Sequence, residues 1–156
     1  MIEVGPFCIK STEDPRPFCE GQIGISLPPT TAVYGVWHAS SQASLLALAE
    51  HVKPGMAVLD LGTGTGVLAV AAERLGAGKV LATEIQEEAL ELAGRTFQAN
   101  ECSRVHLIRG TFPDEEVALA ICNVDEGEKW VREHLDEIKA KKVMAISNEG
   151  KAVFVK

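Results

Sequence analysis

The most constraining feature of this 156-residue chain is an apolar segment that runs directly into closely spaced glycines. The segment covers residues 57–61, and Gly62, Gly64 and Gly66 follow it at alternate positions. Because glycine has no Cβ atom, such a loop can turn tightly and let the backbone approach a ligand. Residues 66–75 then have a helical apolar pattern. We therefore expect a buried parallel strand, a ligand-cradling loop and the N-terminus of a helix.

Strands and helices are expected to alternate on both sides of this loop. An alternation of this kind predicts an α/β fold with a Rossmann-like, doubly wound and mostly parallel sheet. In such sheets ligands bind beyond the carboxyl ends of the strands. The expected helices cover residues 40–52, 66–75, 87–100 and 126–140, and the expected strands cover residues 57–61, 79–83, 105–108, 117–122, 143–146 and, antiparallel, 152–155.

The first 36 residues are rich in Pro and Gly and have short alternating apolar stretches. We expect an extended N-terminal segment (1–36) and a Rossmann-like core (37–156) within one domain. The sequence Pro-Phe-Cys occurs twice, ending at Cys8 and at Cys19. It can be a metal or disulfide clamp, or a hairpin that packs both Phe–Cys pairs inward. The hairpin is favoured, because no other His or Cys has ligand-like spacing, and we expect reduced thiols and no metal site.

Charge and hydropathy exclude several classes of protein. The chain has 15 Lys and Arg against 22 Asp and Glu, a formal net charge of −7. This argues against a broad nucleic-acid surface, which needs clustered basic residues. The apolar stretches are too short to span a bilayer, and Glu3 and Pro6 interrupt any signal-peptide pattern. We expect a cytoplasmic protein without a membrane segment.

The glycine spacing predicts which ligand the loop holds. Dinucleotide-binding loops have the pattern G-x-G-x-x-G, whereas this chain has G-x-G-x-G, which is typical of methyltransferases. Asp60 precedes the loop and suits an ammonium group better than a pyrophosphate. Glu84 ends the next strand, where a carboxylate can bind both ribose hydroxyls of a nucleoside. S-adenosylmethionine is therefore favoured over NAD, and a glycine-rich turn without a ligand is the remaining alternative.

The residues that carry this pattern also resemble a known family. The sequences V-L-D-L-G-T-G-T-G-V-L-A (residues 58–69) and A-T-E-I (82–85) resemble class I S-adenosylmethionine-dependent methyltransferases. Within that class the chain resembles the family that methylates amino groups of ribosomal protein L11, over roughly residues 6–146. That family has an upstream segment A-F-G-T-G-x-H-x-T-T, and residues 32–41, A-V-Y-G-V-W-H-A-S-S, are similar to a shortened form of it.

The resemblance implies roles for individual residues. Asn123 would orient an accepting amine through its amide or backbone carbonyl, and His38 would shape the site; these two are the expected catalytic residues. Their alternative interpretations are a helix cap or turn for Asn123 and a polar residue ahead of a helix for His38. Phe112 could stack on the adenine. The expected cofactor-binding residues are Ser41, Asp60, Gly62, Thr63, Gly64, Gly66, Glu84, Ile85, Thr111, Phe112 and Asn123.

The chain also departs from the family pattern. The family's N-terminal recognition domain has no counterpart in this sequence, and Val36-Trp37 stands where the upstream segment has its second glycine. No N-P-P-[FY] motif follows the fourth strand of the core. The sequence ends soon after the fifth, so we expect a truncated sheet edge covered by a partner chain or a second copy. The expected function is a methyltransferase acting on a protein amino group or a small molecule. The alternative is a non-catalytic S-adenosylmethionine-binding subunit of a larger assembly.

Overall fold

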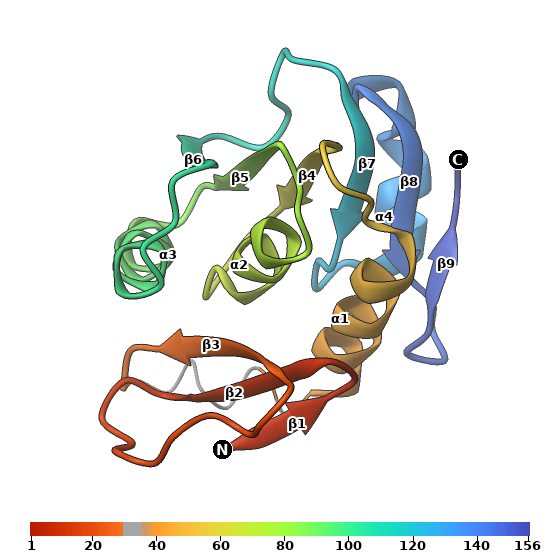
Figure 1. The fold of residues 1–156 in the computed structure, drawn as a ribbon. Coiled ribbons are helices and arrows are strands. Elements are labelled where there is room, and N and C mark those ends of the chain that lie inside the picture. The colour runs from red at the N-terminus through yellow and green to blue at the C-terminus, as the bar shows by residue number, and fades with distance from the viewer. Residues whose placement is uncertain (30–35, 37) are drawn as a thin grey trace.

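A computed structural model describes residues 1–29, 36 and 38–156. Its centre is a six-stranded sheet with the order β6-β5-β4-β7-β8-β9, in which every pairing is parallel except β8 with β9 (Figure 1). The Rossmann-like, mostly parallel sheet predicted from the sequence is confirmed. The strands are β4 (Ala57–Leu61), β5 (Lys79–Glu84), β6 (Val105–Arg109), β7 (Val117–Cys122), β8 (Ala140–Ile146) and β9 (Ala152–Phe154).

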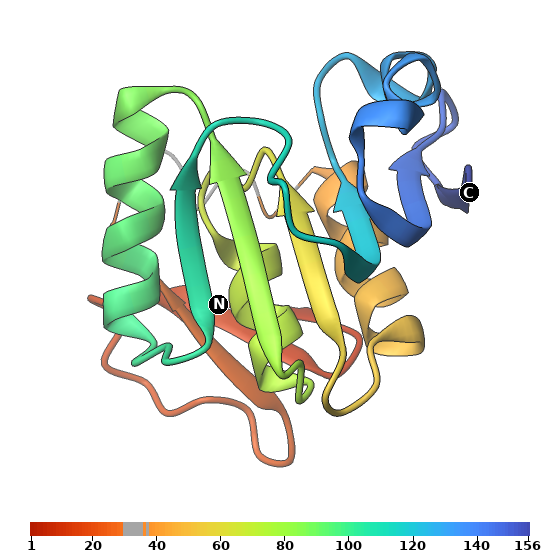
Figure 2. The same ribbon diagram turned by 90° about the horizontal axis from the view of Figure 1, so that it is seen from above.

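Helices cover the two faces of this sheet unequally. One face carries α1 (Ala39–His51), α2 (Val67–Arg74) and α3 (Glu87–Ala99), and the other carries the short α4 (Gly127–Glu133) near β7 and β8 (Figure 1). The segment that joins β6 to β7 contains no helix, so no helix lies in front of β4, β5 and β6 in Figure 2.

The N-terminal residues form a second, three-stranded sheet on the outer side of the helices. It consists of β1 (Ile2–Val4), β2 (Phe7–Ser11) and β3 (Ile23–Leu27); β1 and β2 are antiparallel, and β2 and β3 are parallel. The helices α1, α2 and α3 therefore lie between two sheets (Figure 1). The side chain of Asn100 fastens β3 to the end of α3, because it accepts the Ser26 N–H at 2.9 Å and donates to the Ser26 carbonyl at 2.7 Å.

The core consists of two apolar clusters, one on each face of the large sheet. Side chains alternate along a strand, so Val58 and Val80 join the helices on one face, while Leu59 and Leu81 join α4 on the other. All four side chains are buried. This alternation fixes the register of β4 and β5 and thereby the position of the loops at their carboxyl ends.

The helix expected over residues 126–140 is wrong in length. The helix α4 ends at Glu133, a 3₁₀ turn follows over Leu135–Glu137, and the chain is already extended at Ile138. Ile138 is 2% exposed and packs into the core beneath the sheet, and Ala140 begins β8 by pairing with Val117. A helix that continued to residue 140 would lose both the burial of Ile138 and the first pairings of β8 with β7.

The hairpin expected to pack both Phe–Cys pairs inward is not formed, because β2 pairs in parallel with β3 and Cys19 lies in the loop between them. Phe7 and Cys8 are fully buried, but Phe18 is 37% exposed, so the two Phe–Cys pairs do not both pack inward. The Phe18 ring instead lies against Gly24 of β3, and the Lys10 ammonium sits 4.5 Å from the ring centroid. A cation over an aromatic face is stabilising at a partly exposed site, and this favours the outward position.

The strand β9 covers the outer edge of β8, as the sequence predicts. It pairs antiparallel with β8 from Met144↔Phe154 to Ile146↔Ala152. Coverage of this edge by a partner chain or second copy stays a prediction. Within the described part of the chain, no helix combines the length and the apolar character that crossing a bilayer requires.

Candidate functional site

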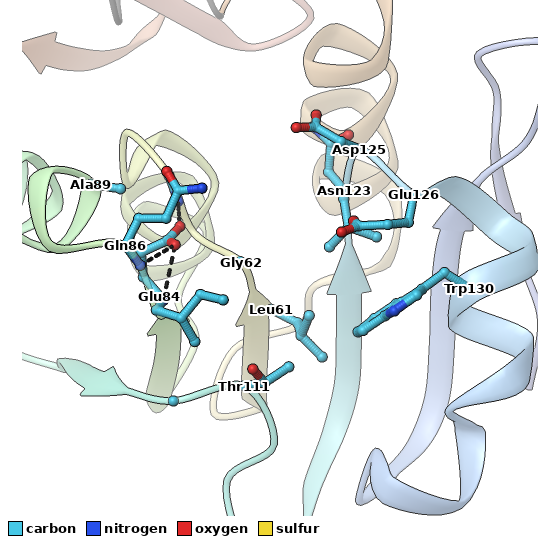
Figure 3. A pocket seen from close by; sticks show the side chains of 14 residues that line it. Leu61, Gly62, Glu84, Gln86, Ala89, Thr111, Asn123, Asp125, Glu126 and Trp130 are labelled. Carbon is cyan, nitrogen blue, oxygen red and sulfur yellow. Dashed lines mark hydrogen bonds between the residues drawn. The ribbon is translucent and has the colours of Figure 1, made fainter.

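A cleft of about 370 Å³ opens where β4, β5, β6 and β7 end (Figure 3). Parallel strands bring their carboxyl ends to the same edge, so residues far apart in sequence meet there. In Figure 3 the side chains that follow β5 face those that follow β7 across the opening. The cleft is lined by Leu61, Gly62, Gly64, Glu84, Ile85, Gln86, Ala89, Gly110, Thr111, Asn123, Val124, Asp125, Glu126 and Trp130.

The three glycines of the loop have two different roles. Gly62 and Gly64 line the cleft, and both have positive φ angles, 73° and 55°. Gly66 has a φ of 87° at the start of α2, and a Cβ atom there would lie 2.8 Å from Cε1 of Phe97. Gly66 therefore lets α2 and α3 pack closely, whereas Gly62 and Gly64 present their backbone to the cleft.

The carboxylate of Glu84 holds the cleft in shape. Its Oε1 accepts the Gly64 N–H at 3.0 Å, and its Oε2 accepts the N–H groups of Ile85 and Gln86 at 2.9 and 3.1 Å. One side chain thus joins the glycine loop after β4 to the N-terminus of α3. A carboxylate has about four acceptor sites, so capacity for a ligand hydroxyl remains.

Asp60 lies beneath the loop rather than in the cleft. Its carboxyl is 1% exposed, its Oδ2 accepts the Thr63 hydroxyl at 2.6 Å, and its Oδ1 has no hydrogen-bond partner among the described residues. Burial raises the pKa of Asp60 to about 7, while the hydrogen bond from Thr63 opposes this rise. The structure therefore gives Asp60 and Thr63 a supporting position under the glycines, outside the cleft lining.

Asn123 lies in the cleft wall, and Ser41 stands next to it. The Asn123 Nδ2 donates to the Ser41 hydroxyl at 3.5 Å across 82 positions of sequence. Asn123 is not the cap of α4, because Glu126 occupies that position. His38 is the N-cap residue of α1, makes no side-chain capping bond and is exposed. Half of the upstream segment in residues 32–41, namely residues 32–35 and Trp37, lies outside the described residues.

Thr111 lines the cleft, but Phe112 lies behind the cleft wall in a stack of three rings. Its ring is nearly parallel to Trp130 at 5.9 Å and to His134 at 5.8 Å, and Trp130 stacks on His134 at 4.2 Å. Of these three rings only Trp130 reaches the cleft (Figure 3). Aromatic stacking of this kind fixes the position of the Trp130 indole.

Sequence reasoning missed part of the lining. The helical pattern over residues 126–140 includes Glu126 and Trp130 but does not indicate that either side chain lines a cleft. Both residues lie shortly after the carboxyl end of β7, at the edge of the sheet where the cleft opens. This position is the signal by which the sequence could have identified them. Gln86, Ala89 and Gly110 carry the same signal after β5 and β6.

The cleft is acidic. Glu84, Asp125 and Glu126 contribute carboxylates, and none of the described lining residues is Lys or Arg. Like charges around a concave site focus a negative potential, which attracts cations. Across the described residues no group of three or more His, Cys, Asp and Glu side chains is placed to hold a metal ion.

Comparisons with known proteins agree with this geometry. A family model for ribosomal protein L11 methyltransferase (PrmA) matches residues 2–145. The chain is 33% identical to the ribosomal protein L11 methyltransferase of Caldicellulosiruptor saccharolyticus, over 79% of this chain and 41% of that protein. It is 31% identical to the enzyme of the same name from Lactobacillus gasseri, over 91% of this chain and 44% of that protein.

A solved structure is also similar to the chain over most of its length. This is the ribosomal protein L11 methylase of Lactobacillus delbrueckii subsp. bulgaricus, with a TM-score of 0.73 and 27% identity over 88% of this chain and 73% of that one. The chain spans less than half the length of the two curated relatives.

Proposed function

Because this chain belongs to the ribosomal protein L11 methyltransferase family, we propose that it binds S-adenosylmethionine in the acidic cleft and transfers the methyl group to an amine. The observation that carries the proposal is the Glu84 carboxylate, which faces the cleft and is bonded to the glycine loop on one side and to α3 on the other. When bound, S-adenosylmethionine supplies a methyl group on a sulfonium that is already electrophilic.

The residues present fit this ligand. Glu84 would take the ribose hydroxyls, and the exposed backbone of Gly62 and Gly64 would receive the methionine portion. Ile85 and Thr111 would flank the adenine. The ligand carries a sulfonium, an ammonium and a carboxylate, so its net charge is positive, and it would enter a cleft whose charged lining residues are all acidic. Asp60 and Thr63 would keep the loop in its turn from below.

We further propose that the acceptor is a protein amine. The relatives are named for methylation of ribosomal protein L11, and Asp125 and Glu126 are exposed carboxylates at the cleft that can attract an ammonium group. The Asn123 Nδ2 points to Ser41, which leaves its carbonyl oxygen as an acceptor for an amine N–H. The ammonium would first lose a proton to solvent, and the bond would then orient the lone pair of the neutral nitrogen toward the methyl group. Alignment of this kind is the main contribution a protein makes to this reaction.

Calorimetry with S-adenosylhomocysteine tests the cofactor site. Gly64→Arg should abolish binding, because the long side chain would fill the cleft. Gly150→Arg is the matched control, since Gly150 also has a positive φ but lies in the β8–β9 turn, outside the cleft. Glu84→Ala should weaken binding about tenfold or more, as expected for lost hydrogen bonds to two hydroxyls. Unchanged affinity in Gly64→Arg would refute the site.

Methyl transfer tests the enzyme and its acceptor. Purified ribosomal protein L11 is incubated with the chain and methyl-labelled S-adenosylmethionine, beside a sample whose amines have been acetylated. Label should enter only the unblocked protein. The Asp125→Asn, Glu126→Gln double variant should raise the KM for the acceptor and leave the affinity for S-adenosylhomocysteine unchanged. Binding without transfer to L11 or to any protein of a cell lysate would instead identify a non-catalytic cofactor-binding subunit.

A further inference from the structure

The N-terminal sheet contains a pair of thiols that the proposed function does not use. Cys8 lies in β2 and is fully buried, and Cys19 lies in the loop that leads to β3 and is partly exposed. Their Sγ atoms are 2.9 Å apart, and the Cys19 N–H donates to the Cys8 Sγ at 3.3 Å. The two sulfur atoms therefore need to approach by only about 1 Å to reach the length of a disulfide bond.

The loop that presents Cys19 is held in place on several sides. The Lys10 ammonium donates to the Asp14 carbonyl at 3.2 Å and also to the Arg16 carbonyl, and it covers the Phe18 ring. The loop closes where the Gln22 N–H donates to the Cys19 carbonyl at 3.1 Å. Cys19 therefore faces Cys8 without any rearrangement of the fold, and fixed proximity of this kind gives an intramolecular thiol a high effective concentration.

We propose that Cys8 and Cys19 form a reversible dithiol–disulfide site that fastens the β2–β3 loop to β2. The oxidant is a low-molecular-weight disulfide, RSSR. The Cys19 thiolate attacks one sulfur of RSSR and releases RS⁻, which leaves Cys19 as a mixed disulfide. The Cys8 thiolate then attacks the Cys19 Sγ, forms the Cys8–Cys19 bond and releases the second RS⁻. The two thiol protons pass to the two RS⁻ ions, so two RSH are formed for each RSSR consumed.

Exposure decides the order of these two steps. An external disulfide can reach Cys19, which is partly exposed, but it cannot reach Cys8, which is buried at 0% exposure. Burial and the neighbouring Cys8 thiol raise the pKa of Cys19 to about 11, the hydrogen bond with Cys8 being the larger cause. A thiol with so high a pKa exchanges slowly at neutral pH, so the site would respond to sustained oxidation.

Differential alkylation tests the site in the full chain. The protein is equilibrated with glutathione at increasing oxidised-to-reduced ratios, quenched with acid, unfolded, alkylated and mapped by mass spectrometry. Cys8 and Cys19 should lose alkylation together as one intramolecular disulfide, while Cys102 and Cys122 stay alkylated. Cys102→Ser, the matched control, should oxidise like the wild type, and Cys19→Ser should leave Cys8 reduced. Free Cys8 and Cys19 at every ratio, or a lasting glutathione adduct on Cys19, would overturn the proposal.

Thermal unfolding provides a second measurement that does not depend on methyl transfer. A bond that closes a loop of about a dozen residues should raise the Tm of the oxidised wild type by about 5–10 °C over the reduced form. Cys102→Ser should show the same shift, and Cys19→Ser should show none. An equal Tm in the two redox states of the wild type would show that the bond does not tighten the N-terminal sheet. The site is independent of the proposed methyl transfer, so failure of either leaves the other standing.

Discussion

The buried carboxyl of Asp60 makes the stability of the glycine loop depend on pH. Burial raises its pKa to about 7 from an ordinary value of 3.8, so the folded chain binds more protons than the unfolded chain between these two values. The stabilisation from this group is complete below about pH 4 and is lost as the pH rises through 7. Carboxyls in exposed ion pairs, such as Glu87 with Arg109, have lowered pKa values and act in the opposite direction.

Asp60→Asn should therefore remove the part of the pH dependence of the free energy of unfolding that Asp60 causes. The asparagine Oδ1 can still accept the Thr63 hydroxyl, but it has no proton to lose. We expect the free energy of unfolding of the wild type to fall, relative to Asp60→Asn, by up to about 4 kcal/mol between pH 4 and pH 8. Urea titrations of both proteins at four pH values measure this difference. A constant difference across the range would mean that Asp60 ionises normally.

A substitution at Gly66 should lower the free energy of unfolding for two reasons, backbone strain and a steric clash. Gly66→Ala introduces strain at a φ of 87° and places a Cβ 2.8 Å from the Phe97 ring, so we expect a loss of about 2–4 kcal/mol. Gly150→Ala has similar strain at a φ of 77°, but no atom of the described residues lies within 4 Å of the added Cβ, so it should lose only about 1 kcal/mol. Denaturant unfolding of the two variants separates the clash from the strain. An equal loss of free energy of unfolding in Gly66→Ala and Gly150→Ala would show that α3 moves aside to relieve the clash.

Among the elements, those built on a single periodic pattern were predictable. The strands β4 and β7 lie at the expected residues, because each is an apolar run between a turn and a glycine or asparagine. The predicted length of α4 was too great, because the helical apolar spacing continues to Ile138. In the structure Ile138 is buried by an extended segment and not by a helix. The parallel pairing of β2 with β3 has no local signal, since a loop and not a helix connects them.

The contact of β3 with α3 depends on one amide. Asn100→Ala would remove both side-chain bonds to the Ser26 backbone and one to the Thr96 carbonyl, so the partly buried N–H and carbonyl of Ser26 would lose these partners. We expect a loss of about 2–3 kcal/mol and faster hydrogen exchange at the Ser26 amide. Gln98→Ala, at an exposed position of the same helix, should change neither. Unaltered exchange in Asn100→Ala would show that other contacts hold the N-terminal sheet.

At the scale of the whole molecule, the charge of −7 and the acidic cleft act together on ligand binding. S-adenosylmethionine has a net charge of +1, and S-adenosylhomocysteine has none. Raising the salt concentration from 0.05 to 0.5 M should weaken binding of the first by about two- to fivefold and of the second by less, because salt screens the long-range attraction. Calorimetry with both ligands measures the difference. Equal salt dependence would show that the cleft potential is too small to matter.

The candidate site was predictable where residues belong to the β4 loop or end the strands, as Gly62, Glu84 and Asn123 do. The candidate site was not predictable where tertiary packing determines whether a side chain lies in the cleft wall. Asp60 points beneath the loop, where the Thr63 hydroxyl donates to it, and Trp130 reaches the cleft wall through its stacking with Phe112 and His134. Positions of this kind follow from side-chain contacts that the apolar periodicity of the sequence does not reveal.

The link between Ser26 and Asn100 also sets an order of events during synthesis. Translation delivers β3 before α3, and the amide that fastens β3 belongs to a residue 74 positions later in the chain. The strand β3 therefore leaves the ribosome before the end of α3, against which it docks, has been made. Contacts so distant in sequence carry a large loop-closure cost, so we expect β3 to reach its final place only after α3 has formed.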